Sequence, residues 1–412
     1  MKRMSMFFAV SALVFAACEE PGSVSIPVTV TFSGNGHTGG MVVPSALLGP
    51  AGLPMPMPVQ GSLVKTACTF RGWNTQANGS GTDYAAGASY AFAADTTLYA
   101  KWKIDWTGID GTASTFGTSG IYGIAWGGGK FVAVGADGKM ARSDDGVYWT
   151  GIDGTVSTFG TSGISGIAYV GGKFVAGGQS GKMAWSGNGE TWTGIDGTVS
   201  SFGTSGIIND IAYGGGKFVA VGIGGLMAWS SNGEAWTGIN GTASTFDTSG
   251  ISGIAWGGGK FVAVGADGKM ARSDDGVYWT GIDETASTFG YSTPINGIAY
   301  GGGKFVAVGN EGKMAWSGNG GVTWTGIDGT ASTFGTSMGT SIISGIAYGG
   351  GKFVAGGSNG KMAYSADGET WTGIDGTAST FGTPSLISGI AYGGGKFVAV
   401  GFDGKIAYHE YP

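Results

Sequence analysis

A hexapeptide, KFVAVG or KFVAGG, recurs seven times after residue 104, and its spacing constrains the fold more than any other feature of the chain. Successive copies lie 43 to 48 residues apart and begin at Lys130, Lys173, Lys217, Lys260, Lys304, Lys352 and Lys396. A period near 40–45 residues with several short strands is typical of propeller blades, whereas helical repeats of that length need amphipathic helices. Glycine interrupts every apolar run here after four to six residues, so the repeats predict an all-β domain.

The copy that spans residues 251–282 predicts four strands joined by glycine-containing turns. These strands are Ile251–Trp256, Lys260–Gly265, Lys269–Ser273 and Val277–Ile282. The second strand is apolar on both of its faces, and such a strand must be covered on both faces. Stacking of the repeats around an axis would supply that cover.

The first and last copies are complementary. A lone fourth strand, Ile104–Ile109, precedes the first complete copy. The last copy has the first three strands, at Leu386–Tyr392, Lys396–Gly401 and Lys405–His409, but no fourth. Pairing these strands would leave no open sheet edge between the ends of the ring. Residues 104–412 therefore predict a seven-bladed β-propeller closed one-plus-three. A large apolar anchor recurs at the fourth strand and is expected to pack between blades, at Trp106, Trp149, Trp192, Trp236, Trp279, Trp324 and Trp371.

Residues 1–18 have the pattern of a secretory signal, with Lys2 and Arg3, an apolar run and then small residues. The end of this segment, Phe15-Ala16-Ala17-Cys18, resembles the lipobox of bacterial lipoproteins. The resemblance implies cleavage before Cys18 and lipidation of that residue, and hence a membrane-anchored protein of the outer membrane or cell surface. The alternative is an ordinary signal peptide with an incidental cysteine. Residues 19–25 are then a short linker.

Residues 26–103 differ in composition, with clustered prolines and no copy of the repeat. The blocks VTVTF (Val28–Phe32), FRGWNTQANGSGTDYAAG (Phe70–Gly87) and DTTLYAKW (Asp95–Trp102) resemble the Listeria–Bacteroides repeat, in the same order. The resemblance implies a small β-grasp-like module found on bacterial surface proteins. The segment Met41–Val59 is longer than usual and is expected to be an irregular loop. Cys68, the only other cysteine, is expected to be a buried, inert thiol.

Six copies of a Ser-x-Asp/Asn-Gly-x-x-Trp motif, one with an inserted residue, resemble the Asp-box, or bacterial neuraminidase repeat. The motif has a structural explanation, because Asp or Asn accepts hydrogen bonds from its own turn and glycine adopts a positive φ. We therefore assign structural roles, not catalytic ones, to Asp145, Asn188, Asn232, Asp275, Asn319 and Asp367. A calcium site at Asp144-Asp145 is a weaker alternative, since one short turn offers too few oxygen ligands.

Enzymatic chemistry finds little support in the sequence. A sialidase-like site needs several convergent arginines, and the repeats contain only Arg142 and Arg272, at equivalent positions. The two histidines, His37 and His409, fall in different predicted domains, which disfavours a metal centre or a Ser-His relay. Five acidic residues depart from the repeat pattern without forming an obvious pair: Asp210, Asp247, Glu284, Glu311 and Glu410. We predict no enzyme, cofactor or metal. The net charge of −6 also disfavours nucleic acid as a partner.

The loops between the second and third strands are expected to share a face with the long connections between repeats, such as Asp110–Gly120. Candidate ligand contacts on this face are Asp137, Gln179, Asp267, Glu311, Asn359 and Asp403. The leading hypothesis is a lipid-anchored envelope protein with a monomeric propeller that binds a glycan or protein through weak multivalent contacts. The alternatives are a carbohydrate-active enzyme and a scaffold without a ligand. Residues 123–153 and 253–283 are identical, a sameness that favours binding or scaffolding, since a catalytic centre needs asymmetry.

Overall fold

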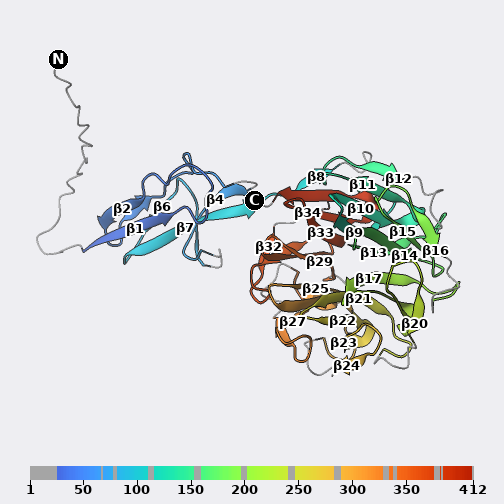
Figure 1. The fold of residues 1–412 in the computed structure, drawn as a ribbon. Helices are drawn as coiled ribbons and strands as arrows, with labels where there is room; N and C mark the ends of the chain where they lie inside the picture. Colours follow the sequence, from blue (N-terminus) through green and yellow to red (C-terminus); the bar gives the residue numbers. More distant parts are fainter. Residues whose placement is uncertain are drawn as a thin grey trace, which may run out of the picture.

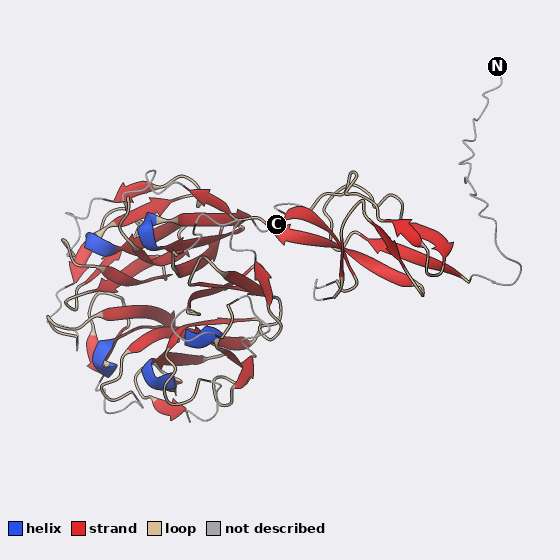
Figure 2. Cartoon of the chain, turned by 180° about the vertical axis from the view of Figure 1, so that it is seen from behind, coloured by secondary structure: helices blue, strands red, loops and turns tan. Residues whose placement is uncertain are grey.

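The computed structural model describes residues 26–65, 68–77, 81–109, 116–152, 159–195, 202–239, 246–282, 289–327, 334–336, 341–374, 381 and 384–410. The predicted signal, the linker, Cys18 and Glu284 lie outside these residues, as do large parts of the connections between repeats. A small lobe lies beside a larger ring of sheets (Figure 1). Strands dominate both parts, with a few short 3-10 turns in the ring (Figure 2). No helix in the described part of the chain is long and apolar enough to cross a membrane.

The small lobe is built on a five-stranded sheet with the order β2-β1-β7-β4-β5. Its strands are β1 (Pro27–Ser33), β2 (Ala46–Pro50), β4 (Cys68–Asn74), β5 (Asp83–Tyr84) and β7 (Thr96–Ile104), and a separate pair joins β3 (Pro54–Pro56) to β6 (Ser89–Ala91). The three motif blocks fall on β1, β4 and β7, which are neighbours: β7 runs parallel to β1 and antiparallel to β4. Val28, Val30 and Phe32 alternate into the core, where they meet Trp73 and Leu98.

The expectation of an irregular loop at Met41–Val59 was wrong, because that segment contains β2 and β3. Met55 and Met57 point into the core of the lobe, and β2 pairs with β1 along its whole length.

Cys68 is only partly buried, not fully as expected. Its pKa is raised, mainly because burial disfavours the thiolate, although nearby Lys65 acts in the opposite direction.

The described residues of the ring form seven four-stranded antiparallel sheets, which we number as repeats 1 to 7. The first strands are β9 (Ile121–Gly127), β13 (Ile164–Val170), β17 (Ile208–Gly214), β21 (Ile251–Gly257), β25 (Ile295–Gly301), β29 (Ile343–Gly349) and β33 (Ile387–Gly393). The second strands are β10 (Lys130–Gly135), β14 (Lys173–Gly178), β18 (Lys217–Gly222), β22 (Lys260–Gly265), β26 (Lys304–Gly309), β30 (Lys352–Gly357) and β34 (Lys396–Gly401).

The outer two strands of each repeat are shorter. The third strands are β11 (Met140–Ser143), β15 (Met183–Ser186), β19 (Met227–Ser230), β23 (Met270–Ser273), β27 (Met314–Ser317), β31 (Met362–Ser365) and β35 (Ile406–Glu410). The fourth strands are β12 (Thr150–Ile152), β16 (Thr193–Ile195), β20 (Thr237–Ile239), β24 (Thr280–Ile282), β28 (Thr325–Ile327), β32 (Thr372–Ile374) and β8 (Thr107–Ile109). Five repeats also have a 3-10 turn after the second strand: η2 (Ala136–Gly138), η5 (Ile223–Gly225), η7 (Ala266–Gly268), η9 (Asn310–Gly312) and η12 (Phe402–Gly404).

The apolar second strands form the core of the ring. In each of them every residue after the leading lysine is buried, so both faces of the strand are covered. The ring has seven buried clusters, each of which draws on two successive repeats. In one of them Val132 and Val134 of repeat 1 meet Phe174 and Trp192 of repeat 2. The recurrent tryptophans are all buried in these clusters.

The first and last strands of the ring lie side by side. β8 pairs with β35, with Thr107 opposite Tyr408 and Ile109 opposite Ile406. One buried cluster combines Ile109 and Val398 of repeat 7 with Phe131 of repeat 1.

His409 takes the place that the Asp-box serine has in other repeats. Its Nδ1 lies 3.0 Å from the carbonyl oxygen of Asp105, and burial is the main cause of its lowered pKa.

Several strand limits differ from expectation by one residue, and two boundaries need an explanation. The fourth strand of repeat 4 begins at Thr280, after Trp279, because the backbone N–H groups of Val277 and Tyr278 donate to the Asp275 side chain instead of to a neighbouring strand. At the junction of the two parts, β7 continues to Ile104. Only Asp105 and Trp106 then separate the last strand of the small lobe from β8.

Candidate functional site

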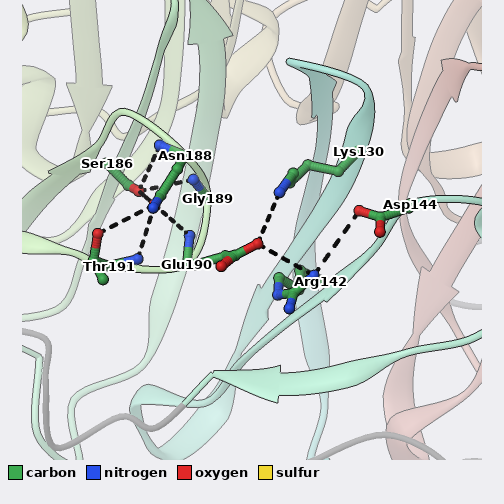
Figure 3. Close-up of polar contacts among 8 residues, drawn as sticks. All are labelled: Lys130, Arg142, Asp144, Ser186, Asn188, Gly189, Glu190 and Thr191. Carbon is green, nitrogen blue, oxygen red and sulfur yellow. Dashed lines mark hydrogen bonds and ion pairs between the residues drawn. The ribbon is translucent and has the colours of Figure 1, made fainter.

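The Asp-box turns are closed by hydrogen bonds within each motif (Figure 3). In repeat 2, Asn188 Oδ1 accepts hydrogen bonds from the backbone N–H groups of Glu190 and Thr191, both at 2.9 Å. The Ser186 hydroxyl accepts one from the N–H of Gly189 at 2.8 Å. Gly189 has a φ of +73°, a conformation that favours glycine. A Cβ there would also lie only 3.1 Å from atoms of Phe174 and Val132, so the space favours glycine as well. The turn therefore uses its polar atoms internally.

The other five boxes repeat this pattern, with Asp145, Asn232, Asp275, Asn319 and Asp367 as acceptors. Burial alone would raise the pKa of the Asp145 carboxyl, but N–H groups of Tyr148 and Val147, the Ser143 hydroxyl and Lys396 together lower it. The same balance lowers the pKa of Asp275 and of Asp367. These carboxylates are held ionised by their own turns, which suits closure and not proton transfer.

Glu190 links two repeats through ion pairs. Its carboxylate lies 3.0 Å from Lys130 Nζ and 3.3 Å from Arg142 Nη1, both in repeat 1 (Figure 3). Asp144 lies 3.9 Å from the same arginine. Arg142 thus serves an inter-repeat network, and its equivalent, Arg272, lies on β23 of repeat 4. The two arginines do not converge on one site.

The face that carries the candidate loop residues is shaped by contacts between loops. Lys139 Nζ donates to the carbonyl of Phe116 and to the Ser119 hydroxyl, and Ser119 donates to Asp137. The η turns therefore lie against the connections between repeats, on one face, as expected. A left-handed φ between +57° and +60° recurs at Asp137, Asp267, Glu311, Asn359 and Asp403.

Gln179 does not share that conformation. In repeat 2 the left-handed residue is Ser180, and Gln179 occupies the place of Ala136. Its side-chain oxygen accepts a hydrogen bond from the N–H of Gly163. Exposed apolar side chains accompany the acidic ones on this loop face: Ile223, Tyr291 and Phe402.

A narrow channel of about 150 Å³ runs where the first strands meet. Serine and asparagine side chains line it, and Asp210 is the only charged residue among the lining residues. The other six repeats have glycine at this position. Asp210 Oδ2 accepts a hydrogen bond from the N–H of Ile254 in repeat 4, and Oδ1 accepts one from Ile211. Enclosure in the channel raises the pKa of Asp210 to about 7, because burial outweighs these two hydrogen bonds.

A larger cleft, of about 760 Å³, lies between the small lobe and repeat 6. Four basic side chains and a single acidic one line it: Lys65, Arg71, Lys101, Lys103 and Asp83. Sequence reasoning missed this site. A signal existed, because three of these cations, Arg71, Lys101 and Lys103, flank the FRGW and YAKW blocks, whose strands pair in the module.

No group of three or more His, Cys, Asp or Glu residues that could hold a metal ion occurs within the described ranges. Of the acidic residues that depart from the repeat pattern, Glu311 pairs with Lys313 at 3.0 Å and Glu410 with Lys396 at 3.3 Å. Asp210 is separated from both by its enclosure in the channel.

Comparison with known proteins identifies the two parts of the chain separately. Residues 29–101 match the Listeria-Bacteroides repeat domain family. No curated protein matches the chain. The structure is similar to YCF48 bound to D1 peptide, with a TM-score of 0.57 and 16% identity over 75% of this chain and 96% of that one.

Two further solved structures give the same answer. YCF48 from Cyanidioschyzon merolae has a TM-score of 0.54 and 17% identity, over 74% of this chain and 98% of that one. The WD40 beta propeller domain of Doa1 has a TM-score of 0.53 and 12% identity, over 71% of this chain and 94% of that one. The larger part of the chain is a β-propeller.

Proposed function

We propose that this chain is a lipid-anchored envelope protein whose propeller binds a protein ligand without catalysis. In this proposal the ring has seven blades and is closed one-plus-three by β8 and β35, and Cys18 carries the lipid. The observation that carries the proposal is the loop face, where Ile223, Tyr291 and Phe402 are exposed by 38%, 69% and 43% beside internally paired polar groups. Exposed apolar and aromatic side chains within a polar rim are typical of protein-binding surfaces.

The polar groups of this face are poor candidates for catalysis. Ser119 donates to Asp137, and Lys313 pairs with Glu311, so each carboxylate is already used within the fold. A glycosidase needs two carboxylates that face one another across a substrate. The similar structure of YCF48, which is bound to D1 peptide, adds support for a binding role.

The proposed anchor sets where the ligand would be found. Residues 19–25 would span at most about 25 Å when extended, so the small lobe would lie close to the membrane surface. The ring follows the lobe after two residues, Asp105 and Trp106. A propeller held in this way presents its loops to partners in the envelope and not in free solution.

The test compares the mature chain with two variants, a triple variant of the loop face and a double variant that serves as its control. Ile223→Ser, Tyr291→Ser and Phe402→Ser together remove the apolar groups of the loop face. Tyr148→Ser with Tyr278→Ser removes two tyrosines, exposed by 81% and 79%, from the Asp-box turns. Those turns join third to fourth strands and therefore lie at the opposite end of the antiparallel sheets.

Envelope proteins captured on the mature chain are identified, purified and titrated against all three forms. The proposal expects at least a tenfold loss of affinity in the loop-face variant and less than a twofold change in the control. Equal binding by all three forms would place the ligand elsewhere. A glycan array that binds the mature chain where no protein does would replace the protein ligand with a glycan. Turnover of chromogenic glycosides would overturn the non-catalytic assignment. Absence of binding and of turnover in all of these assays would favour a scaffold without a ligand.

A further inference from the structure

The cleft between the small lobe and repeat 6 has an unusual charge for this protein. The chain carries 27 acidic and 21 basic residues, yet the cleft is lined by four cations and one carboxylate. Lys101 neutralises that carboxylate, with its Nζ 2.6 Å from Asp83. Lys103 pairs with Asp105 at 3.8 Å, whereas Lys65 and Arg71 have no ion pair with any described carboxylate. The cleft therefore has an excess of positive charge that the protein itself does not balance.

Burial makes this excess costly. The pKa of Lys65 is lowered chiefly by desolvation and further by Lys352, although Cys68 partly opposes the shift. Its Nζ has a backbone carbonyl, that of Asn35, within 3.3 Å. An anion placed beside this amine would favour its charged form, because an opposite charge nearby raises the pKa of a lysine. The electrostatics thus select an acidic ligand.

The backbone around the cleft selects the form of that ligand. β5 is the terminal strand of the five-stranded sheet, and β32 is the terminal strand of repeat 6. Residues of both strands line the cleft, Asp83 and Tyr84 on one side and Thr372 to Ile374 on the other. The outer edge of a terminal strand presents backbone N–H and C=O groups that can pair with an added strand. Two such edges in one basic cleft suit an extended peptide.

We propose that this cleft binds an extended, acidic peptide segment by strand addition, with Arg71 and Lys65 contacting its carboxylates. The volume of about 760 Å³ is within the range of roughly 300–1,000 Å³ that is usual for ligand pockets. Half-buried Tyr364 and Trp102 supply apolar walls for alternate side chains. An anionic glycan shares the charge but lacks backbone groups spaced to pair with a strand edge. The site is separate from the loop face and does not depend on the ligand proposed there.

The probe is a fluorescein-labelled dodecapeptide of alternating threonine and glutamate, titrated with the mature chain and followed by fluorescence anisotropy. The expected result is saturable binding that weakens at least tenfold between 50 and 500 mM salt, because the contacts are charge pairs. The same peptide with lysine in place of glutamate should not bind. Arg71→Glu should lower affinity at least tenfold, and Arg71→Lys should lower it less, since lysine keeps the charge without the guanidinium fork.

The matched control is Arg272→Glu, which makes the same charge change on β23. This strand lies on the far side of the ring from the small lobe (Figure 1). Affinity within twofold of the unmodified chain is expected. Equal losses in both charge-reversal variants would overturn the proposal, since binding would then follow net charge alone. Absence of peptide binding would overturn it as well, including the case in which tetragalacturonate binds instead.

Strand addition has its own readout. Two versions of the glutamate peptide carry N-methyl groups on alternate residues, one set on the glutamates and one on the threonines. The peptide is expected to pair with one of the two strand edges, and only one edge of an added strand donates to it, so one version should lose binding and the other should keep it. Equal behaviour of the two would refute strand addition. The loop-face triple variant should bind the peptide normally, which separates failure of this site from failure of the proposed function.

Discussion

Asp210 is the position where one charge should dominate the pH dependence of stability. The carboxyl titrates at about 7 in the folded protein, against a reference value of 3.8. Because the folded pKa is raised, the folded state holds a proton that the unfolded chain releases above pH 4. The stabilising contribution is therefore complete below about pH 4 and is lost as the pH rises to about 7 and beyond.

The size of this effect follows from the shift of about 3 units. At 1.36 kcal/mol per unit, the full loss is about 4 kcal/mol, and more than half of it falls between pH 5 and pH 8. Replacement by glycine, the residue of the other six repeats, removes the titrating group. The variant should therefore gain roughly 2–3 kcal/mol relative to the unmodified protein when the pH is raised from 5 to 8. Losses that do not depend on pH, such as the greater freedom of glycine in the unfolded chain, cancel in this comparison.

The assay is equilibrium unfolding in urea, followed by tryptophan fluorescence at pH 5 and pH 8 for both proteins. Asp210→Asn is a second variant of nearly the same shape that cannot ionise, and it should show the same reduced pH dependence as Asp210→Gly. The channel-lining residues include no other carboxyl group, amine or imidazole to mimic the effect. A difference between variant and parent that stays constant within about 0.5 kcal/mol across this range would refute the reasoning.

Three further predictions concern the closure, the turns and the anchor. The lowered pKa of His409 means that its contribution to stability is complete above pH 6.5 and is lost as the pH falls below that value. His409→Asn should therefore lessen the fall in the urea midpoint between pH 7.5 and pH 5. An unchanged pH dependence of the midpoint would contradict this. Asp275→Ala should lower the free energy of unfolding by about 1–2 kcal/mol, because the turn loses its hydrogen bonds. The neighbouring Asp274→Ala, which removes only an exposed ion pair, should lower it by at most about 0.5 kcal/mol. Equal losses would contradict the structural role assigned to the Asp-box. Cys18→Ala should abolish metabolic acyl labelling and release the protein from membranes, and labelling that persists would rule out the anchor.

Local patterns predicted much of the fold because the interactions that create it are themselves local or repeated. The second strands could be identified because their apolar residues alternate onto two faces that must both be buried. The turns at Asp275 and most of its equivalents fit the sequence pattern, because their side chains accept hydrogen bonds from backbone N–H groups two and three positions later. The three motif blocks of the small lobe fall on β1, β4 and β7, which are neighbours in its sheet, whereas β2 and β3 were not predicted.

Features that depend on long-range placement could not be predicted. Met55 and Met57 belong to a proline-rich segment whose three-residue strand is too short for a periodic signal, so its place in the core was missed. Asp210 stood out as a break in the glycine pattern, but its raised pKa arises from enclosure by the first strands of other repeats. The basic cleft needs both parts of the chain in position, and these parts are joined by Asp105 and Trp106.

We propose that the ring closes with β8 beside β35, a pairing that also brings the small lobe close to repeat 6. Thr107 and Tyr408 are opposite one another, and directly opposed residues in antiparallel strands are near enough for a disulfide. Thr107→Cys with Tyr408→Cys, in a chain without Cys18 and Cys68, should cross-link under mild oxidation, as shown by peptide mass and faster migration on a non-reducing gel. Trp229, the residue equivalent to Tyr408 in repeat 3, provides the control partner. A closed ring predicts a cross-link in the first pair and none in the second. A first pair that stays reduced, or equal cross-linking of both, would contradict the closed ring.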